Sequence, residues 1–492
     1  MRLESVTKQP FLTDFPLTVF ATAKRRLQAA IRQSSAIIAR RSLSGYAVLF
    51  EDILPGDFLS SIDQTLRQRS FGHLPVFWAW LAQILEANAS CQKAVGLIQS
   101  WCRTCDLPIP SSDTSSYCKA RCRLSLSFLQ AVHQRIRTHL SSRVTAENQW
   151  RGFTLMAMDG SSVHLMDTEE NQRLYPQPSV QKPGCGFPTM GIVGLLNLGH
   201  GGWEHIETCP HTQHDTKAAA VLATHLRQGD LLLADRAFCS YELIARSLAQ
   251  GAHILMRLHQ ARARSLDWRK GKRLSSFERL VTWCRPQQPR GSSLTREEWN
   301  ALPATLELRL IKLGYENRAG QKSELIVVTT LTDPKKHCGI ELADLYARRW
   351  DIELKLRDLK TTLGMERFEV KSPAMAHKTL WMSVIAFNFI RSLMQRAAAQ
   401  GEQPVWHLSF KGVLDLVVAS HESFRVHAGR PRKRAEAFTI LLETCATKLI
   451  DQRPFRSEPR AVKRRPKSYQ LLTERRGCFQ EIHHRSRYQK SA

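Results

Sequence analysis

The chain has 492 residues, 43% of them hydrophobic, and a formal net charge of +27. It is too long for one ordinary compact domain, and its hydrophobic content excludes an intrinsically disordered chain. It contains no run of about 18 uncharged apolar residues, so no transmembrane helix is expected. The positive charge predicts a polyanionic partner, because basic surfaces gain affinity by releasing counterions from phosphates.

Residues 1–148 are expected to form a helical N-terminal domain, because apolar residues recur there at helical spacing. A helix near 91–101 is followed by a proline-containing break at 106–110, and a further helix is expected to begin near Tyr117. This order is typical of a helix-turn-helix DNA-binding domain, although a plain helical bundle with a solvated basic face fits the local sequence equally well. The basic residues on the last helix are Lys119, Arg121 and Arg123.

Residues 149–260 change character, because short apolar runs now alternate with helical patterns. This alternation predicts an α/β sheet with buried central strands. A β-rich insertion is expected over 261–335, a second part of the core over 336–400, and a basic helical C-terminal region over 401–492. The apolar runs expected as strands are 153–158, 191–198, 230–234 and 252–258.

Asp159 and Asp235 each follow one of these apolar runs directly. The carboxyl ends of parallel strands form the site in open α/β sheets, so the two carboxylates are expected to lie close together. Like charges so placed repel each other, and their hard oxygen atoms favour Mg²⁺ or Mn²⁺ as the compensating ion. The alternative is that each aspartate only caps a helix or fixes a turn.

A third carboxylate, Glu353, is expected on a single amphipathic helix over 344–364. Tyr346, Arg349, Glu353 and Lys360 follow one another at offsets of three, four and seven, which places them on one broad stripe of that helix. Such a stripe offers an acid to a metal ion and basic groups to phosphates. The alternative is an exposed face joined by intrahelical ion pairs.

The spacing Tyr346-x2-Arg349-x3-Glu353-x6-Lys360 resembles the signature of the DDE transposases of the insertion-sequence-four family. The segments Asp159-Gly160-Ser161 and Asp235-Arg236-Ala237-Phe238 resemble the two aspartate segments of that family, with Ala237 where glycine is usual. The resemblance extends from about residue 90 to residue 475.

This resemblance implies an RNase H-like core with a β-rich insertion between the second aspartate and the glutamate. It implies that Asp159, Asp235 and Glu353 hold two Mg²⁺ ions, with Mn²⁺ as a substitute, and catalyse phosphoryl transfer. It further implies a homodimer on paired terminal inverted repeats, which excises its element through a hairpin and joins it to target DNA.

The resemblance also implies contacts with DNA outside the triad. Tyr346, Arg349 and Lys360 are expected to contact phosphates near the cut. A tryptophan of the insertion is expected to stack on a flipped base, and the candidates are Trp268, Trp283 and Trp299.

Two rival classes share much of this pattern, namely a catalytically dead DNA-binding derivative and an RNase H-like nuclease that does not join strands. All three carboxylates and both basic signature residues are present, which argues against the first. The basic helical N-terminus and basic tail favour a transposase over the second. We expect a cytoplasmic, nucleoid-associated prokaryotic protein, because the N-terminus lacks the features of a signal peptide.

Three further patterns leave alternatives open. Cys102, Cys105, Cys118 and Cys122 have the look of a zinc site, but Cys118 and Cys122 fall on an expected basic helix, which disfavours it. His211, His214 and Asp215 could be ligands, although a polar loop leading into a helix is favoured. The tail 425–492 holds 18 Lys and Arg against 6 Asp and Glu; it is expected to grip DNA, or to pack on the core through Tyr469, Leu471 and Leu472.

Overall fold

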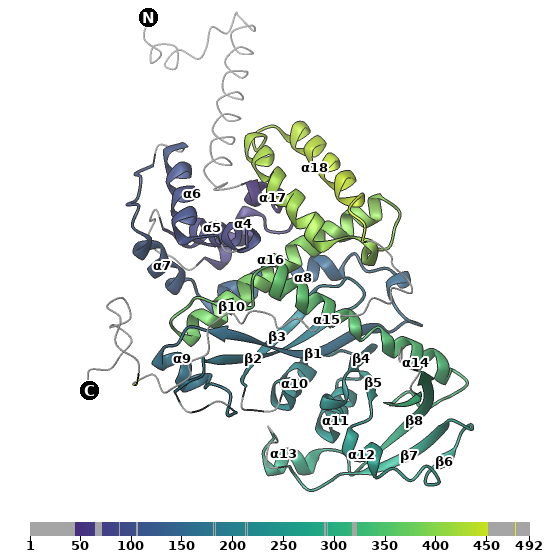
Figure 1. The fold of residues 1–492 in the computed structure, drawn as a ribbon. Coiled ribbons are helices and arrows are strands. Elements are labelled where there is room, and N and C mark those ends of the chain that lie inside the picture. Colours follow the sequence, from purple (N-terminus) through teal and green to yellow (C-terminus); the bar gives the residue numbers. More distant parts are fainter. Residues whose placement is uncertain are drawn as a thin grey trace, which may run out of the picture. The chain divides into compact units, whose positions relative to one another are not determined.

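The structure is a computed structural model, and it divides into two compact units (Figure 1). One unit contains residues up to Leu124 together with Leu414–Thr447, and the other contains Ser125–Val413 and the residues from Lys448 onward. No helix among the described residues is long and apolar enough to cross a membrane. The structure describes residues 45–63, 71–87, 89–104, 107–180, 182, 184–211, 213, 215–289, 292, 294–316, 322–450 and 478.

The first unit is helical throughout its described part. Its helix α5 is buried along most of its length, because Phe77, Trp78, Trp80 and Leu81 leave it almost no polar face. Helix α7 begins at Thr114, three residues before the expected start at Tyr117, because the side chain of Asp113 accepts a hydrogen bond from the amide of Ser115. The helices are α3 (Gly45–Leu49), α4 (Gly56–Ile62), α5 (His73–Leu85), α6 (Cys91–Thr104), α7 (Thr114–Arg123) and α18 (Pro431–Ala446). Helix α17 (Phe410–Val426) crosses the boundary of the two units.

The second unit is built on one mixed sheet of ten strands, with the order β3-β2-β1-β4-β5-β9-β8-β7-β6 and β10 paired to β1. The pairs β1–β2 and β2–β3 are antiparallel, whereas the pairs β1–β4 and β4–β5 are parallel. The expectation of an α/β core is confirmed. The strands are β1 (Thr154–Leu165), β2 (Thr189–Asn197), β3 (Trp203–Pro210), β4 (Asp230–Ala234), β5 (His253–Arg257), β6 (Lys272–Arg273), β7 (Glu278–Cys284), β8 (Thr305–Glu316), β9 (Lys322–Thr329) and β10 (Arg367–Phe368).

The β-rich segment after residue 260 continues the same sheet. Strand β9 pairs antiparallel with β5, and β8, β7 and β6 follow outward from it. The segment also contains the short helices α12 (Gln260–Arg264) and α13 (Arg296–Ala301). The strands of the expected insertion and those of the core therefore share one hydrogen-bonded framework.

Helices cover both faces of the first part of this sheet (Figure 1). Helices α8 (Leu126–Ser141) and α16 (Pro373–Gln400) pack together on one face, and α10 (Thr216–Leu222) and α11 (Tyr241–Ala249) lie on the other. The apolar face of α8 packs in this second unit, so the division falls after Leu124 and not at the expected residue 148. The expected strands at 153–158, 191–198, 230–234 and 252–258 are present as β1, β2, β4 and β5.

Candidate active site

Asp159 and Asp235 lie side by side, because Asp159 is on β1 and Asp235 directly follows the parallel neighbouring strand β4. Met158 on β1 is in register with Ala234, the last residue of β4, so the next residues along both strands are the two aspartates. Neighbouring strands are about 4.8 Å apart, and residues in register on parallel strands point to the same face. Asp235 follows the end of its strand, as expected. Asp159 does not, because β2 pairs with β1 as far as His164 and holds it extended to Leu165.

The carboxyl group of Asp159 is mostly buried and has other charged groups around it. Its pKa is raised to about 6, chiefly by burial and also by the nearby carboxylates of Glu353 and Asp235. The amide of Gly160 donates a hydrogen bond of 2.8 Å to Asp159 Oδ1, which opposes this shift, as does the charge of Arg349. The charge of Asp159 is thus coupled to those of both other acids of the proposed triad.

Arg349 connects Asp159 with Glu353. Its Nη2 donates a hydrogen bond of 3.0 Å to Glu353 Oε1, and its Nη1 lies 3.6 Å from Asp159 Oδ2. Burial alone would lower the pKa of Arg349, but Tyr346 and the acids around it raise it on balance. Within the described residues the three carboxylates do not all bring oxygen atoms within 4.8 Å of one another, which is consistent with the position of Arg349 between two of them.

The segment that carries Glu353 is broken into three parts, whereas a single helix over 344–364 was expected. Helix α14 (Gly339–Ala347) is followed by α15 (Trp350–Arg357) and by the π-helical turn η4 (Asp358–Thr362). The break arises because backbone bonds shorten to a spacing of three residues, as from Arg349 N–H to the carbonyl of Tyr346 at 3.0 Å. The break leaves Tyr346, Arg349 and Glu353 beside the aspartates.

The two remaining signature residues also reach this site. Tyr346 is buried, which raises its pKa to about 12; Arg349 and Arg257 oppose this shift and Asp235 adds to it. Lys360 Nζ donates a hydrogen bond of 3.3 Å to the hydroxyl of Ser161, two residues beyond Asp159 on β1. Burial lowers the pKa of Lys360. The Ser161 contact was not anticipated, although the Asp-Gly-Ser sequence placed the hydroxyl close by.

A cavity of about 290 Å³ carries positive charge near Asp235. Arg236, which follows Asp235 directly, lines it together with Arg257, the arginine that also influences Tyr346. The other charged residues of the cavity are Arg264 and Glu324. Three guanidinium groups against one carboxylate make this hollow suitable for phosphate oxygens.

The three candidate tryptophans have different surroundings. Trp299 is only 3% exposed and donates a hydrogen bond of 3.2 Å to the carbonyl of Pro286, so burial removes it as a stacking candidate. Trp268 and Trp283 are half-buried. The guanidinium of Arg262 covers the ring of Trp283 at 4.0 Å, and that of Arg279 lies 5.0 Å from the ring of Trp268.

Trp350 is a stacking candidate that sequence reasoning missed. Its side chain is 60% exposed, and its ring centre lies 4.8 Å from the guanidinium of Arg349. It therefore presents an aromatic face beside the triad. The signal in the sequence was a lone large aromatic residue directly after Arg349 in a highly charged stretch.

Of the three basic residues expected to reach DNA from α7, two are exposed and one packs against aromatic rings. Lys119 and Arg123 are exposed. Arg121 is half-buried, and its guanidinium lies over the rings of Trp80 and Tyr117 at 5.3 and 5.2 Å. Lys119 and Arg123 are therefore the better placed of the three to reach a partner.

The cysteine and histidine patterns of the sequence do not assemble as ligand sets among the described residues. Cys118 Sγ lies 3.9 Å from that of Cys91, which is not one of the four cysteines of the zinc pattern, and Cys102 is fully buried. Asp215 precedes α10 as the residue at its N-cap, without a side-chain capping bond. Two residues of these patterns, Cys105 and His214, lie outside the described residues. The same holds for Tyr469, Leu471 and Leu472, the residues expected to pack the tail on the core.

Comparisons with known proteins bear on the same residues. The family model described as "Transposase DDE domain" matches residues 150–389, a range that includes Asp159, Asp235 and Glu353. The chain is 24% identical over 417 residues to "Transposase InsG for insertion sequence element IS4" of Escherichia coli (strain K12), covering 82% of this chain and 88% of the relative. It is 27% identical over 99 residues to "Putative transposase InsZ" of the same organism, covering 20% of this chain and 33% of the relative.

Among solved structures, a cryo-EM structure of the piggyBac transposase synaptic complex with hairpin DNA is similar with a TM-score of 0.43. The sequence identity is 11%, and the match covers 83% of this chain and 86% of that one.

Proposed function

Because the chain belongs to the DDE transposases of the insertion-sequence-four family, we propose that Asp159, Asp235 and Glu353 are its catalytic carboxylates. An enzyme of this family cleaves DNA and transfers strands. The observation that carries the assignment is the position of Arg349, which contacts Glu353 at 3.0 Å and Asp159 at 3.6 Å while Asp235 lies in register beside Asp159. The three acids come from three separate elements, and the contacts of Arg349 with two of them support the assignment.

We propose that the core is RNase H-like. The order β3-β2-β1-β4-β5, with an antiparallel first part and a parallel second part, supports this assignment. The first two acids lie on the central strand β1 and directly after its neighbour β4, and the third comes from a later helix.

DDE transposases use divalent metal ions, and we propose two Mg²⁺ ions, replaceable by Mn²⁺, as the cofactor. The donor set fits this choice, because all three side chains offer hard carboxylate oxygens. Burial raises the pKa of Asp159 and the neighbouring carboxylates add to that shift, and a bound cation would favour the charged form of all three acids. When bound, such ions activate the attacking hydroxyl and stabilise the leaving oxygen.

The chain's own residues would then position the DNA. Arg349 must release at least one carboxylate when the metal site fills, which frees its guanidinium for a phosphate near the cut. Lys360 lies beside β1 and offers a second cation, and Tyr346 lines the same side near Asp235. Trp268, Trp283 or the exposed Trp350 would stack on a flipped base.

We propose a cut-and-paste reaction with a hairpin intermediate on paired terminal inverted repeats, carried out by a homodimer. The net charge of +27 supports binding to double-stranded DNA, with Lys119, Arg121 and Arg123 of the N-terminal domain on the repeat and the basic tail on DNA of the paired complex. The same partner makes the cytoplasm, at the nucleoid, the expected location.

The deciding experiment is a strand-transfer assay with DNA that carries the element's own ends and a separate target. Cleavage followed by joining in Mg²⁺ is the expected result. Cleavage without joining would identify a nuclease, and specific end binding without cleavage would identify a catalytically dead derivative.

A further inference from the structure

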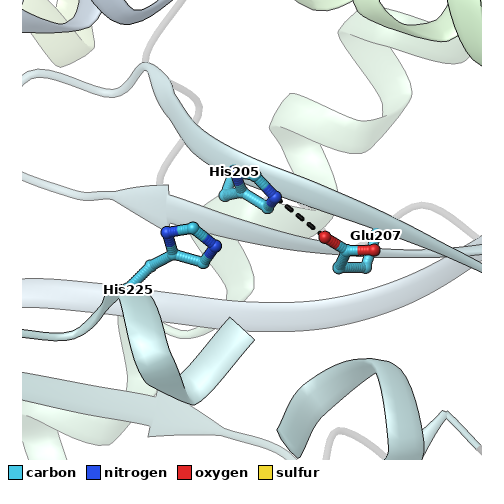
Figure 2. Close-up of side chains that lie close together, drawn as sticks. All are labelled: His205, Glu207 and His225. Atoms are coloured by element: carbon cyan, nitrogen blue, oxygen red, sulfur yellow. Dashed lines mark hydrogen bonds and ion pairs between the residues drawn. The ribbon is translucent and has the colours of Figure 1, made fainter. Parts of the chain in front are cut away.

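A compact cluster of two histidines and one glutamate lies at the edge strand β3 (Figure 2). His205 Nε2 is 2.8 Å from Glu207 Oε1, and the ring of His225 stacks on that of His205 with centroids 3.9 Å apart and planes 22° from parallel. One donor atom of each side chain lies within 4.8 Å of the other two. In the described part of the chain, no other group of histidine, cysteine, aspartate or glutamate residues meets this spacing.

The fold builds this cluster from two segments. His205 and Glu207 are two residues apart on β3, so they point to the same face of the strand. A β-bulge separates them from Glu204, because Leu195 pairs with His205 while Leu196 pairs with Trp203. His225 ends the 3₁₀ turn η2 (Ala223–His225), which continues α10.

The cluster and the catalytic carboxylates lie on opposite faces of the sheet. His205 is in register with Leu195, which is in register with Met158, so these three side chains share one face. Asp159 is the next residue after Met158 and therefore points to the other face. An ion held by the cluster could not be one of the catalytic ions.

We propose that His205, Glu207 and His225 bind one divalent transition-metal ion of the Zn²⁺ class. Two imidazole nitrogens and one carboxylate oxygen are the ligand set that zinc accepts and magnesium disfavours. Ligand atoms around a tetrahedral zinc ion are about 3.4 Å apart. The donor atoms, now within 4.8 Å of one another, would approach by up to about 1.5 Å, and the two stacked rings would turn their nitrogens toward one ion. All three residues are half-buried, which leaves the fourth position open to water.

The charges around the cluster are compatible with a cation. Arg137 is the nearest opposing charge, and its guanidinium is paired with Glu204 at 3.1 Å. The carboxylate of Glu207 supplies the negative charge.

Such an ion would have a structural role. It would join the edge strand β3 to η2, and the chain after η2 leads directly into β4, at whose end Asp235 lies. Zn²⁺ binding would therefore stabilise the part of the sheet that carries a catalytic residue without touching the reacting DNA.

The test is a titration of the full-length, tag-free chain with Co²⁺ in excess Mg²⁺, which occupies the proposed catalytic site, followed by competition with Zn²⁺ against a chromophoric chelator. The expected result is one ion per chain, with the intense visible bands of four-coordinate Co²⁺ and no thiolate charge-transfer band. Zn²⁺ should raise the melting temperature, and excess Mg²⁺ should not displace it.

His225→Gln and Glu207→Gln should each weaken Zn²⁺ binding at least tenfold and abolish the melting-temperature gain. His253→Gln is the matched control, because His253 is also a half-buried strand histidine with a neutral partner, Thr330, at 3.0 Å. Glu207→Gln retains a hydrogen-bond acceptor for His205, and circular dichroism of the metal-free variants checks that both fold. Unchanged Zn²⁺ affinity in both variants, a six-coordinate spectrum lost in Asp235→Asn, or thiolate bands would overturn the proposal.

Discussion

Arg349 holds Glu353 through a hydrogen bond of 3.0 Å from the preceding turn of the same segment. Its second nitrogen reaches Asp159 at 3.6 Å, so one cation neutralises two carboxylates that come from different elements. In the metal-free protein, the guanidinium of Arg349 thus offsets part of the negative charge that the proposed divalent ions would neutralise. Under the proposed two-metal mechanism, filling the site would require Arg349 to move, so substitutions at this residue are informative.

The triad itself gives the first prediction. Asp159→Asn, Asp235→Asn and Glu353→Gln should each reduce cleavage by at least about 1,000-fold, equivalent to about 4 kcal/mol of lost transition-state stabilisation. Each variant removes a metal ligand while preserving shape, so binding to the DNA end should change little. Cleavage of labelled element ends in Mg²⁺ measures the effect, with Asp344→Asn on the exposed side of α14 as the control. Normal cleavage by a variant would remove that residue from the triad.

Arg349→Ala should slow cleavage per bound complex by about 10- to 100-fold, because it removes a phosphate contact made close to the reaction. End affinity should stay within about threefold, since one contact among many is lost. Arg348→Ala is a close control, because Arg348 pairs with Asp351 at 3.5 Å. Single-turnover cleavage at saturating protein separates the two effects. Equal loss of binding on any DNA, with unchanged turnover of the bound complex, would contradict the proposed role.

Trp350→Ala should impair cleavage or hairpin formation by about 10- to 100-fold, whereas Trp350→Phe should recover most of the activity, because base stacking is worth about 1–3 kcal/mol. The exposed indole has no packing role that would make the alanine variant unfold. Fluorescence of 2-aminopurine placed next to the cut reports whether a base leaves the stack. If Trp268→Ala or Trp283→Ala quenches that signal and Trp350→Ala does not, Trp350 is not the stacking residue.

Asp230, at the start of β4, should make stability depend on pH. The pKa of its carboxyl group is raised to about 6, chiefly by burial and also by the nearby charge of Glu204. The amide of Arg227 donates a hydrogen bond of 2.8 Å to this carboxyl group, which opposes the shift. The native state thus binds this proton more tightly than the unfolded state, whose aspartates titrate near about 3.9, so stability falls as pH rises from about 4 to about 6 and the loss persists above that. Asp230→Asn should therefore stabilise the protein at pH 8 by up to about 3 kcal/mol, and by about half as much at pH 5.

Urea unfolding of Asp230→Asn across this pH range measures the difference. Glu147→Gln serves as the control for removing an exposed acidic charge. A gain that does not grow between pH 5 and pH 8 would show that Asp230 is not protonated in the native state.

Gly194→Ala should destabilise the protein by about 1–3 kcal/mol through steric overlap. Gly194 pairs with Asp159 across β1 and β2, and a Cβ there would lie 2.4 Å from the indole of Trp203. Gly314→Ala is the control in the same sheet, because a Cβ at Gly314 meets no atom within 4 Å. Thermal unfolding of both variants compares them directly, and an equal change in melting temperature would contradict the packing argument.

The sequence predicted the buried strands because their signals are local, and the three acids remain a prediction from the same kind of signal. An apolar run followed by an acid predicted β4 and Asp235. Strand β3 escaped this approach, since Glu204, His205 and Glu207 interrupt its apolar pattern and its pairing with β2 is what makes it a strand. The extension of β1 past Asp159 has the same cause, because the partner strand decides where a strand ends.

The helix break before Trp350 was missed for a different reason. The sequence around Arg348 and Arg349 contains no glycine or proline, and the break depends on backbone bonds that shift by one residue. The contacts of Arg349, Lys360 and Cys118 also depend on the tertiary structure, because their partners are far away in the sequence. Asp159 is 190 residues from Arg349, Ser161 is 199 from Lys360, and Cys91 is 27 from Cys118. Helical periodicity places a side chain on a face but does not identify what packs against that face.

Because β1 and β4 pair in parallel, the distance between Asp159 and Asp235 is set by the register of the two strands and not by the number of residues between them. Register makes Asp159 and Asp235 neighbours although β2, β3 and α10 lie between them in the chain, and β9 returns to β5 in the same way before Glu353 is reached. Loops between these strands can therefore gain or lose residues without displacing the reacting groups. An epitope or fluorophore inserted near Gln287, between β7 and α13, should therefore leave the proposed catalytic carboxylates in place.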